Sequence, residues 1–480
     1  MLIGRKKELE SLNNAYNSSR AEFVIVYGRR RVGKTYLVQQ AFNGNFAFRV
    51  TGLFKKNKRR QLENFTNALA EYSGYDMDIP KDWYEAFRLL KKYLQSLDLE
   101  RKVVFIDELP WMATAKSDFV GALESFWNGW GANEDSLKLI VCGSASSWFS
   151  ENVFNDKGGL FNRDTMRIYL KAFSLRETED FFVYQGITLS RYEIIECYMI
   201  LGGIPYYLRK LNKSLSLSQN IDMLFFHPKA LLFDEFTHLY DALFNKSEDY
   251  VRIVQALSAK RSGLTQKEIL ANIGMQQSGN FSKMLDNLIV SDIISKITTY
   301  GARQKEERYV LTDFYTIFYF RFIKGNNSMD SAFWTNRLDS PSLDAWRGLS
   351  FERVCLLHLN EIKAKLGITG VATETYSFEK KSCGENDKGA QIDLIIDRRD
   401  QIINVCECKY SRNVFTIDKN YHNTLKNKVD KFKEFSKTRK AVHTTMITTF
   451  GLGNSMYDNS VESVITADDL FAINSNLYLK

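Results

Sequence analysis

A glycine-rich stretch near the N-terminus has the residue types and spacing of a phosphate-binding loop. Residues 28–35 read Gly-Arg-Arg-Arg-Val-Gly-Lys-Thr and fit the pattern G-x-x-x-x-G-K-[ST]. Glycines at the first and sixth places let the backbone turn tightly and direct its N–H groups at a phosphate chain. We expect Lys34 to reach the β- and γ-phosphates and Thr35 to hold Mg²⁺. The residues predicted to bind the nucleotide in this stretch are Gly28, Arg29, Arg30, Arg31, Val32, Gly33, Lys34, Thr35 and Tyr36.

A pair of acidic residues supplies the second half of this chemistry. Asp107 and Glu108 directly follow the apolar run Val103-Val104-Phe105-Ile106. A buried parallel strand delivers the residue after it to the edge of the sheet where phosphate loops lie. Asp107 is therefore predicted to bind Mg²⁺ through water, and Glu108 to polarise the water that attacks the γ-phosphate. The alternative is a strand that simply ends in an acidic turn.

Charged residues in three separate segments near the C-terminus form a second candidate constellation. Glu352 lies within an apolar helix, Asp393 within the strand 391–397, and Glu407 and Lys409 within the strand 402–410. The two-residue period of a strand places Glu407 and Lys409 on one face. Charges inside an apolar strand are costly unless they are paired or used. These residues are therefore candidates for chemistry on a charged substrate.

The elements that must position the first set of residues follow an alternating pattern. Apolar runs of strand length occupy residues 23–26, 102–106 and 137–142, and residues 36–42 and 82–99 have helical spacing. From residue 174 the pattern turns helical, beginning with a capping box at Ser174 and Glu177. The pattern predicts an α/β core with a parallel sheet, followed by a helical region.

Residues 250–311 have the pattern of a winged helix-turn-helix. A helix over 250–257 precedes a second helix with a capping box at Thr265 and Glu268, a third over 278–288, and two strands over 293–297 and 308–311. The candidates for nucleic-acid contact on the third helix are Asn280, Ser282 and Lys283. That helix carries few basic residues, so plain interdomain packing stays an open alternative.

Several N-terminal residues resemble the archaeal-type ATPase family within the AAA+/STAND class. The resemblance rests on Gly4-Arg5 followed by Glu8-Leu9 ahead of the phosphate loop. It implies a γ-phosphate sensor role for Ser144 at the tip of a strand, and an arginine finger at Arg163 that reaches a γ-phosphate in the same or a neighbouring subunit. A turn that caps a helix, for Ser144, and an ordinary surface arginine, for Arg163, are the alternatives. The resemblance also implies a helical lid at Gly202-Gly203-Ile204-Pro205, where a simple turn is the other interpretation.

The order Glu352, Asp393, Glu407-x-Lys409 resembles the PD-(D/E)xK nuclease fold, with which archaeal-type ATPases commonly end. The resemblance implies that Asp393 and Glu407 coordinate Mg²⁺, that Lys409 helps to deprotonate a metal-bound water, and that Glu352 orients the cluster. No proline precedes Asp393, where the name-giving motif often has one. A degenerate nuclease that only binds is the alternative.

Basic residues gather beside this constellation. Ten basic and three acidic residues lie between Lys409 and Lys440, a net charge of +7, and a smaller basic cluster occupies residues 54–60. Such a run is suited to tracking a phosphate backbone, although an exposed helix face has the same composition. Its place next to Glu407 and Lys409 favours nucleic acid.

Composition narrows the class of protein. The chain has 480 residues, 44% hydrophobic and 25% charged, and a net charge of +8. That is typical of a globular protein with about three domains. The six cysteines form no C-x-x-C pair, and no apolar run is long enough for a signal peptide or a membrane span. We expect a reduced, cytoplasmic protein with no membrane partner.

These observations together predict an α/β protein with an AAA+-like P-loop NTPase core, a helical lid, a winged helix and a restriction-endonuclease-like domain. The expected boundaries are 1–173, 174–246, 247–325 and 326–480. The predicted cofactors are ATP and Mg²⁺, and the predicted partners are DNA and other copies of the chain. The expected function is Mg²⁺-dependent ATP hydrolysis that controls DNA binding or cleavage. The alternative is a STAND-like signalling switch or scaffold with an inactive nuclease fold.

Overall fold

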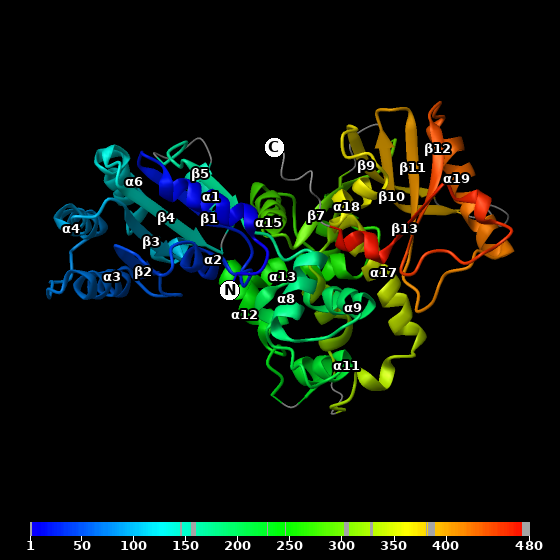
Figure 1. The fold of residues 1–480 in the computed structure, drawn as a ribbon, viewed down its shortest axis with the longest axis horizontal. Helices are drawn as coiled ribbons and strands as arrows, with labels where there is room; N and C mark the ends of the chain where they lie inside the picture. The colour runs from blue at the N-terminus through cyan, green and yellow to red at the C-terminus, as the bar shows by residue number, and fades with distance from the viewer. Residues whose placement is uncertain are drawn as a thin grey trace. The chain divides into compact units, whose positions relative to one another are not determined.

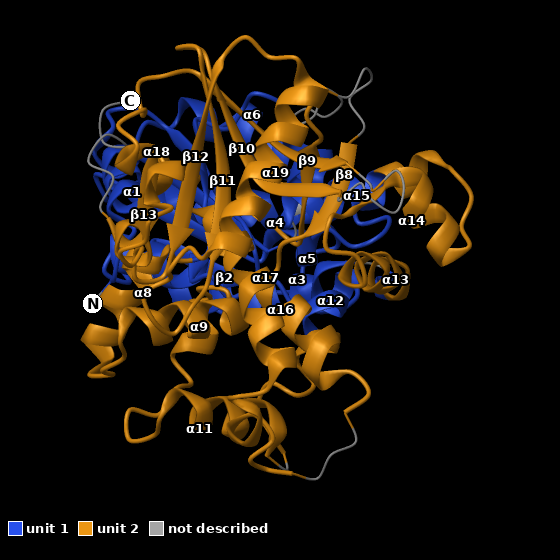
Figure 2. Ribbon diagram, turned by 90° about the vertical axis from the view of Figure 1, so that its right-hand side faces the viewer, with its two compact units in different colours: residues 1–172, 238–247, 283–291 blue, residues 173–237, 248–282, 292–480 orange. Residues whose placement is uncertain are grey.

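The computed structural model describes residues 2–144, 146–154, 160–227, 229–244, 246–301, 307–326, 330–380, 382 and 389–472. The chain forms two compact units, coloured separately in Figure 2. Unit 1 comprises residues 1–172, 238–247 and 283–291, and unit 2 comprises residues 173–237, 248–282 and 292–480. No helix among the described residues is long and apolar enough to cross a membrane.

Unit 1 is built from strands alternating with helices, as the sequence predicts (Figure 1). Its principal elements are α1 (Lys6–Asn17), β1 (Glu22–Tyr27), α2 (Lys34–Ala41), β2 (Phe48–Thr51), α3 (Lys58–Ser73), α4 (Trp83–Ser96), β3 (Lys102–Asp107), α5 (Leu109–Met112), α6 (Phe119–Gly129), β4 (Leu137–Gly143), α7 (Ser146–Phe149) and β5 (Met166–Tyr169).

The strands of unit 1 form one parallel sheet in the order β2-β3-β4-β1-β5. Strands β1, β3 and β4 are apolar and almost wholly buried, as expected for parallel strands covered on both faces. Helices α3, α4 and α6 share a core with one set of alternate strand residues, while α1 and α2 contact the sheet and each other separately. The carboxyl ends of β1, β3 and β4 therefore meet at one edge of the sheet.

Unit 2 begins with helices and ends with a mixed sheet. Three helices, α12, α13 and α15, lie partly in unit 1. The principal elements of unit 2, with these three included, are α8 (Leu175–Gln185), α9 (Arg191–Leu201), α10 (Pro205–Leu208), α11 (Leu217–Ile221), α12 (Glu235–Leu243), α13 (Ser247–Ser258), β6 (Leu264–Thr265), α14 (Gln266–Ile273), α15 (Gly279–Val290), β7 (Ile294–Thr298), β8 (Glu307–Leu311), α16 (Phe314–Phe318), α17 (Pro341–Leu357), α18 (Leu359–Lys365), β9 (Thr373–Lys380), β10 (Ala390–Arg398), β11 (Ile402–Lys409), α19 (Lys419–Ser436), β12 (Ala441–Thr448) and β13 (Ser463–Thr466).

Local signals in the sequence set several helix ends in unit 2. The predicted capping boxes are both confirmed, at Ser174 with Glu177 before α8 and at Thr265 with Glu268 before α14. Gly203, in the predicted lid hinge, has a φ of 65°, and a Cβ placed there would lie 2.4 Å from the carbonyl oxygen of Phe173. This close approach requires glycine whether or not the segment moves.

The segment predicted as a winged helix contains helices α13, α14 and α15 and the small antiparallel sheet β6-β8-β7. The turn between α13 and β6 is held against β8. Gly263 in this turn has a φ of 74°, and a Cβ there would lie 2.6 Å from the carbonyl oxygen of Tyr309. Arg308 donates a hydrogen bond of 3.1 Å to the carbonyl of Gly263. The turn is thus pinned to β8 by both shape and hydrogen bonding.

The last part of unit 2 is a five-stranded sheet in the order β13-β12-β11-β10-β9 (Figure 1). Strands β9, β10 and β11 form an antiparallel meander, α19 crosses over, and β12 and β13 then pair in parallel. Helix α17, which starts at Pro341 after the Ser340 cap, contacts β11, and α19 contacts β10 and β12. The pairing of β10 with β9 shifts between Ile392 and Ile395, which places Asp393 at an irregularity in the strand.

A buried histidine makes the stability of unit 2 depend on pH. His358, at the end of α17, accepts a hydrogen bond of 3.2 Å from the backbone N–H of Leu175 at Nε2, and its Nδ1 lies 2.8 Å from the carbonyl of Val354. Burial lowers the pKa of His358 from 6.5 to about 4. The folded chain therefore holds this imidazole neutral, while the unfolded chain protonates it below pH 6.5.

We expect the free energy of unfolding to fall by up to about 3 kcal/mol between pH 6.5 and pH 4 because of this group. His358→Gln should flatten that part of the curve, measured as urea-unfolding midpoints over the pH series. The exposed His238 provides a matched control, since His238→Gln should keep the wild-type slope. An unchanged slope in His358→Gln would show that other groups cause the pH dependence.

Candidate functional site

The loop between β1 and α2 has the backbone expected of a phosphate cradle. Gly28 and Gly33 have φ angles of 137° and 95°, and Arg31 adopts a φ of 72°. A Cβ on Gly28 would lie 2.4 Å from the carbonyl oxygen of Leu170, directly after β5, so only glycine fits. Helix α2 begins at Lys34, which places its N-terminus at the end of the loop. Backbone donors and the helix dipole thus face the place where phosphates would bind.

Lys34 is folded into this loop. Its ammonium donates hydrogen bonds of 3.0 Å to the carbonyl of Gly28 and 2.8 Å to the carbonyl of Arg29. The side chain is buried, and this burial lowers the pKa of Lys34. The ammonium therefore lies at the centre of the loop, with its charge balanced by carbonyl dipoles.

Asp107, at the end of β3, accepts hydrogen bonds from three elements. Thr35 Oγ1 donates to Oδ2 at 2.9 Å, and the backbone N–H of Glu108 and the thiol of Cys142 donate to Oδ1 at 2.9 Å and 2.7 Å. The Thr35 hydroxyl and the Asp107 carboxylate are hard oxygen donors in direct contact, which fits the ligand preference of Mg²⁺. When bound, Mg²⁺ would neutralise charge on the phosphates of the nucleotide.

Glu108 lies beside Asp107 and is held by Ser144. Ser144 donates to Glu108 Oε2 from its hydroxyl at 3.0 Å and from its backbone N–H at 3.2 Å. Burial, opposed by the charge of Lys34, raises the pKa of Glu108. A carboxylate with a raised pKa accepts a proton more readily, which suits a general base. The structure therefore brings the predicted base and the predicted sensor residue together.

The comparisons with known proteins agree with this geometry. Residues 2–211 match the family described as an ATPase domain predominantly from Archaea. The chain carries an ATPase domain of this family.

Relatives of this archaeal-type ATPase domain occur in Methanocaldococcus jannaschii. One uncharacterized protein is 26% identical over 374 residues, which is 75% of this chain and 79% of the relative. An uncharacterized ATP-binding protein is 50% identical over 40 residues, which is 8% of this chain and 68% of the relative. Among solved structures, a Walker-type ATPase of Pyrococcus abyssi aligns at 17% identity with a TM-score of 0.47, covering 67% of this chain and 96% of that one. The ORC2 protein of Aeropyrum pernix aligns at 12% identity with a TM-score of 0.42, and the alignment covers 66% of this chain and 93% of the ORC2 chain.

The remaining predicted residues of the ATPase domain have varied surroundings. Arg29 and Val32 are buried, and Tyr36 is 44% exposed. Arg30 lies over the ring of Trp111 and donates to the carbonyl of His238 at 3.2 Å. Arg163 is exposed, in a turn closed by a hydrogen bond from its N–H to the carbonyl of Leu160.

Two contributors to this site were missed in the sequence. Cys142 was treated only as part of an apolar strand, whereas its thiol donates to Asp107. Arg5 was noted only for its place in a motif, but it donates to the carbonyl of Lys171 at 2.7 Å. It thereby connects the start of α1 to the segment after β5. In the sequence, only the position of Arg5 directly after Gly4 indicated that this residue has a role.

Hydrolysis by the ATPase domain should depend on Glu108 more than on Ser144. Glu108→Gln removes the proton acceptor while keeping the shape, so we expect kcat to fall by about 10²-fold or more with ATP binding retained. Ser144→Ala removes only a hydrogen bond to Glu108, so a smaller fall, about tenfold, is expected. Steady-state phosphate release and fluorescent-nucleotide binding measure the two effects. Loss of nucleotide binding in Glu108→Gln would contradict this assignment.

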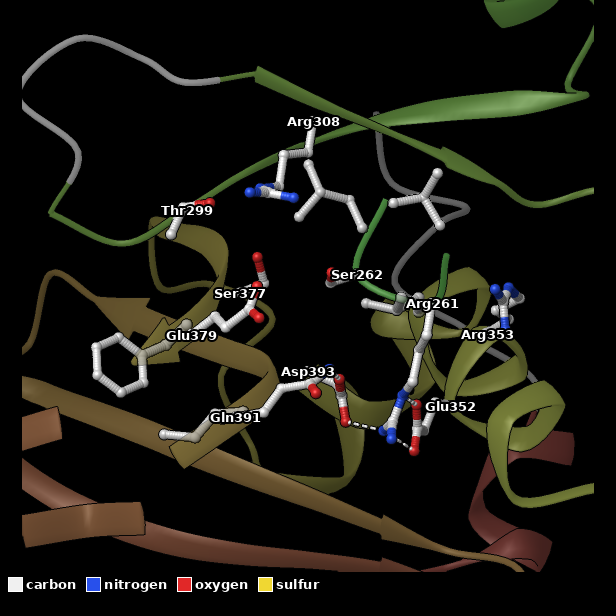
Figure 3. A pocket seen from close by; sticks show the side chains of 15 residues that line it. Arg261, Ser262, Thr299, Arg308, Glu352, Arg353, Ser377, Glu379, Gln391 and Asp393 are labelled. Atoms are coloured by element: carbon white, nitrogen blue, oxygen red, sulfur yellow. Dashed lines mark hydrogen bonds and ion pairs between the residues drawn. The ribbon is translucent and has the colours of Figure 1, made fainter. Parts of the chain in front are cut away.

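A second candidate site lies wholly within unit 2, where Glu352 and Asp393 meet. They line a cavity of about 280 Å³ together with Arg261, Arg308 and residues of β7, β9 and β10 (Figure 3). Arg261 Nη2 lies 2.6 Å from Asp393 Oδ2, and its Nε lies 3.1 Å from Glu352 Oε2. Burial, and then the nearby carboxyl of Asp393, raise the pKa of Glu352 to about 8 despite Arg261.

Glu407 has its own cations. Lys428 Nζ lies 2.6 Å from Glu407 Oε2, Tyr421 donates to Oε1 at 2.9 Å, and Lys409 Nζ lies 3.6 Å from Oε1. Burial opposes ionisation, but the ammonium of Lys428 outweighs it and lowers the pKa of Glu407. The pairing of β10 with β11 runs from Asp397 with Ile403 to Leu394 with Cys406. Asp393 and Glu407 are the residues that directly follow the end of this pairing on the two strands.

The predicted metal ligands of unit 2 do not form a ligand set in this conformation. Among the residues that the structure describes, no three or more His, Cys, Asp or Glu side chains are grouped so as to hold a metal ion. Glu352 and Asp393 are occupied by Arg261, and Glu407 is occupied by Lys428. The residues as placed here therefore do not fit a divalent cation.

The candidate DNA-contacting residues are partly paired. Lys283 forms an ion pair of 3.0 Å with Glu151, Ser282 accepts from Gln266 at 3.1 Å, and Asn280 is exposed. On α19, Lys419, Lys426 and Lys433 are exposed and recur every seven residues, which places them on one helix face.

Proposed function

We propose that the nucleotide state of the ATPase domain controls DNA binding and cleavage by residues 326–480. The observation that supports this proposal is the order of elements α17, α18, β9, β10, β11, α19 and β12, with Asp393 and Glu407 at the end of the β10–β11 pairing and Lys409 two residues after Glu407 on β11. This is the arrangement in which a PD-(D/E)xK nuclease would carry its residues. The cleavage reaction would be hydrolysis of a phosphodiester bond.

The charges around Glu407 suit a site that handles phosphate. Lys409 lies close to Glu407 without being buried, with 36% of its side chain exposed, whereas Lys428 is more enclosed at 18%. Lys428 can therefore hold Glu407 ionised while Lys409 remains accessible to a substrate. A positioned ammonium stabilises the negative charge that develops on phosphate oxygens in the transition state.

Helix α19 provides a surface for a phosphate backbone. Tyr421 and Lys428 point to Glu407, while Lys419, Lys426 and Lys433 lie on an exposed face of the same helix. One helix would thus both hold a carboxylate of the site and bind neighbouring phosphates. Contacts of this kind are independent of sequence and weaken with salt.

A signalling switch or scaffold is the second candidate, and one observation favours it. Every carboxylate predicted to bind metal in unit 2 is paired with a protein cation: Glu352 and Asp393 share Arg261, and Glu407 contacts Lys428. A nuclease fold that has lost its catalytic activity would keep these ion pairs because they stabilise the folded chain. In that case ATP would drive assembly of copies of the chain, without DNA.

The proposed function predicts cleavage of plasmid and linear DNA with Mg²⁺ or Mn²⁺, analysed on gels with and without ATP. Lys409→Ala should abolish nicking because it removes the phosphate-facing charge, and Lys34→Ala should abolish its dependence on ATP. Lys92→Ala, an exposed lysine on α4, is the control. If no variant or condition gives cleavage while ATP promotes assembly, the switch is the better description.

Binding to DNA should be salt-dependent through α19. A triple change of Lys419, Lys426 and Lys433 to Gln should reduce the magnitude of the slope of log K against log salt by about 2 to 3. Fluorescence anisotropy with a duplex over a salt series measures this slope. An unchanged slope would place the DNA contact elsewhere.

A further inference from the structure

One guanidinium connects the two carboxylates of the cavity in unit 2. Arg261 belongs to the turn between α13 and β6, Glu352 to α17 and Asp393 to β10. Nη2 of Arg261 contacts both Glu352 Oε1 and Asp393 Oδ2, and Nε contacts Glu352 Oε2 (Figure 3). The cation therefore lies between the carboxylates, where a metal ion shared by them would have to bind.

The carboxylates need such a cation. Their side chains are only 15% and 22% exposed, and two carboxyl groups this close and this enclosed disfavour double ionisation. Removing one partner of an enclosed ion pair leaves an uncompensated charge, so the site requires something positive at this position. In this structure the guanidinium of Arg261 supplies that positive charge.

The backbone around Arg261 is held in place. The turn is pinned to β8 through Gly263 and Arg308, and α17 is tied to the same strand because Arg353 donates to the carbonyl of Leu311 at 3.0 Å. Opening by movement of the whole turn would break these contacts. Arg261 is therefore held beside both carboxylates, at the wall of the adjoining cavity of about 280 Å³.

We propose that Arg261 is a built-in cation that fills the place between Glu352 and Asp393, so that this pair as folded is closed to divalent metal. This inference rests on the proposed function, since it concerns the same site. It explains why Glu352 and Asp393 do not fit a divalent cation as they are placed here.

The test is Mn²⁺ binding to the full-length chain without nucleotide, followed by electron paramagnetic resonance. Arg261→Ala should bind Mn²⁺ more tightly than wild type by about tenfold or more, because the guanidinium no longer occupies the place between the two carboxylates. Arg261→Ala combined with Asp393→Asn should lose this gain. Asp107→Asn, measured in parallel, identifies Mn²⁺ bound in the ATPase domain.

Two control variants distinguish the effect of the Arg261 guanidinium from the effect of positive charge elsewhere in the same turn. Lys260→Ala removes a positive charge from the same turn and should leave Mn²⁺ affinity at the wild-type value. Arg261→Lys keeps the charge but loses the planar fork, so its affinity should lie nearer to wild type than that of Arg261→Ala. Thermal unfolding confirms that each variant is folded. If Arg261→Ala does not fold, the comparison is made between Arg261→Lys and wild type. Equal affinity in wild type and both Arg261 variants would overturn the inference.

The outcomes distinguish this inference from the proposed function. Tighter Mn²⁺ binding in Arg261→Ala without DNA cleavage by any variant would support the built-in cation and refute the nuclease. Cleavage by wild type with the same Mn²⁺ dependence as Arg261→Ala would support the nuclease and refute the built-in cation.

Discussion

A single buried carboxylate, that of Asp107, connects three elements of the ATPase domain. It accepts hydrogen bonds from Thr35 on α2, from the backbone of Glu108 after β3, and from Cys142 on β4. A buried charge must be satisfied, so the positions of these elements are constrained together. All three donors are neutral, and the positive charge nearby is the buried ammonium of Lys34, which interacts electrostatically with Asp107.

Unit 2 satisfies its buried carboxylates in the opposite way. Glu352 and Asp393 are matched by Arg261, Glu407 by Lys428, and elsewhere Glu196 by Arg347 at 2.8 Å. A cation contacts each of these carboxylates, in addition to neutral donors such as Tyr421 at Glu407 and Gln391 at Asp393. The same rule for buried charge is therefore met by neutral hydrogen-bond donors at Asp107 and by a directly contacting protein cation at each of these carboxylates of unit 2.

Local patterns in the sequence were enough to predict much of this architecture. The phosphate loop, the strands before Asp107 and Ser144, and the capping boxes at Ser174 and Thr265 all depend on residues a few positions apart. The ion pairs that determine the chemistry of unit 2 join residues that are far apart in the sequence. Arg261 is 91 residues from Glu352 and 132 from Asp393, and no periodicity joins them. The role of Lys428 was equally hidden, because only its register with Tyr421 on α19 directs it to Glu407.

Charge balance shows why the acidic pair of unit 2 is stable with a protein cation beside it. With a pKa of about 8, Glu352 tends to hold a proton at neutral pH, so the pair carries close to one negative charge, which the single charge of Arg261 balances. Breaking this ion pair would leave an uncompensated charge in an enclosed place. Arg261 therefore does two things at once: it fills the place between the carboxylates, and it joins the turn after α13 to α17 and β10.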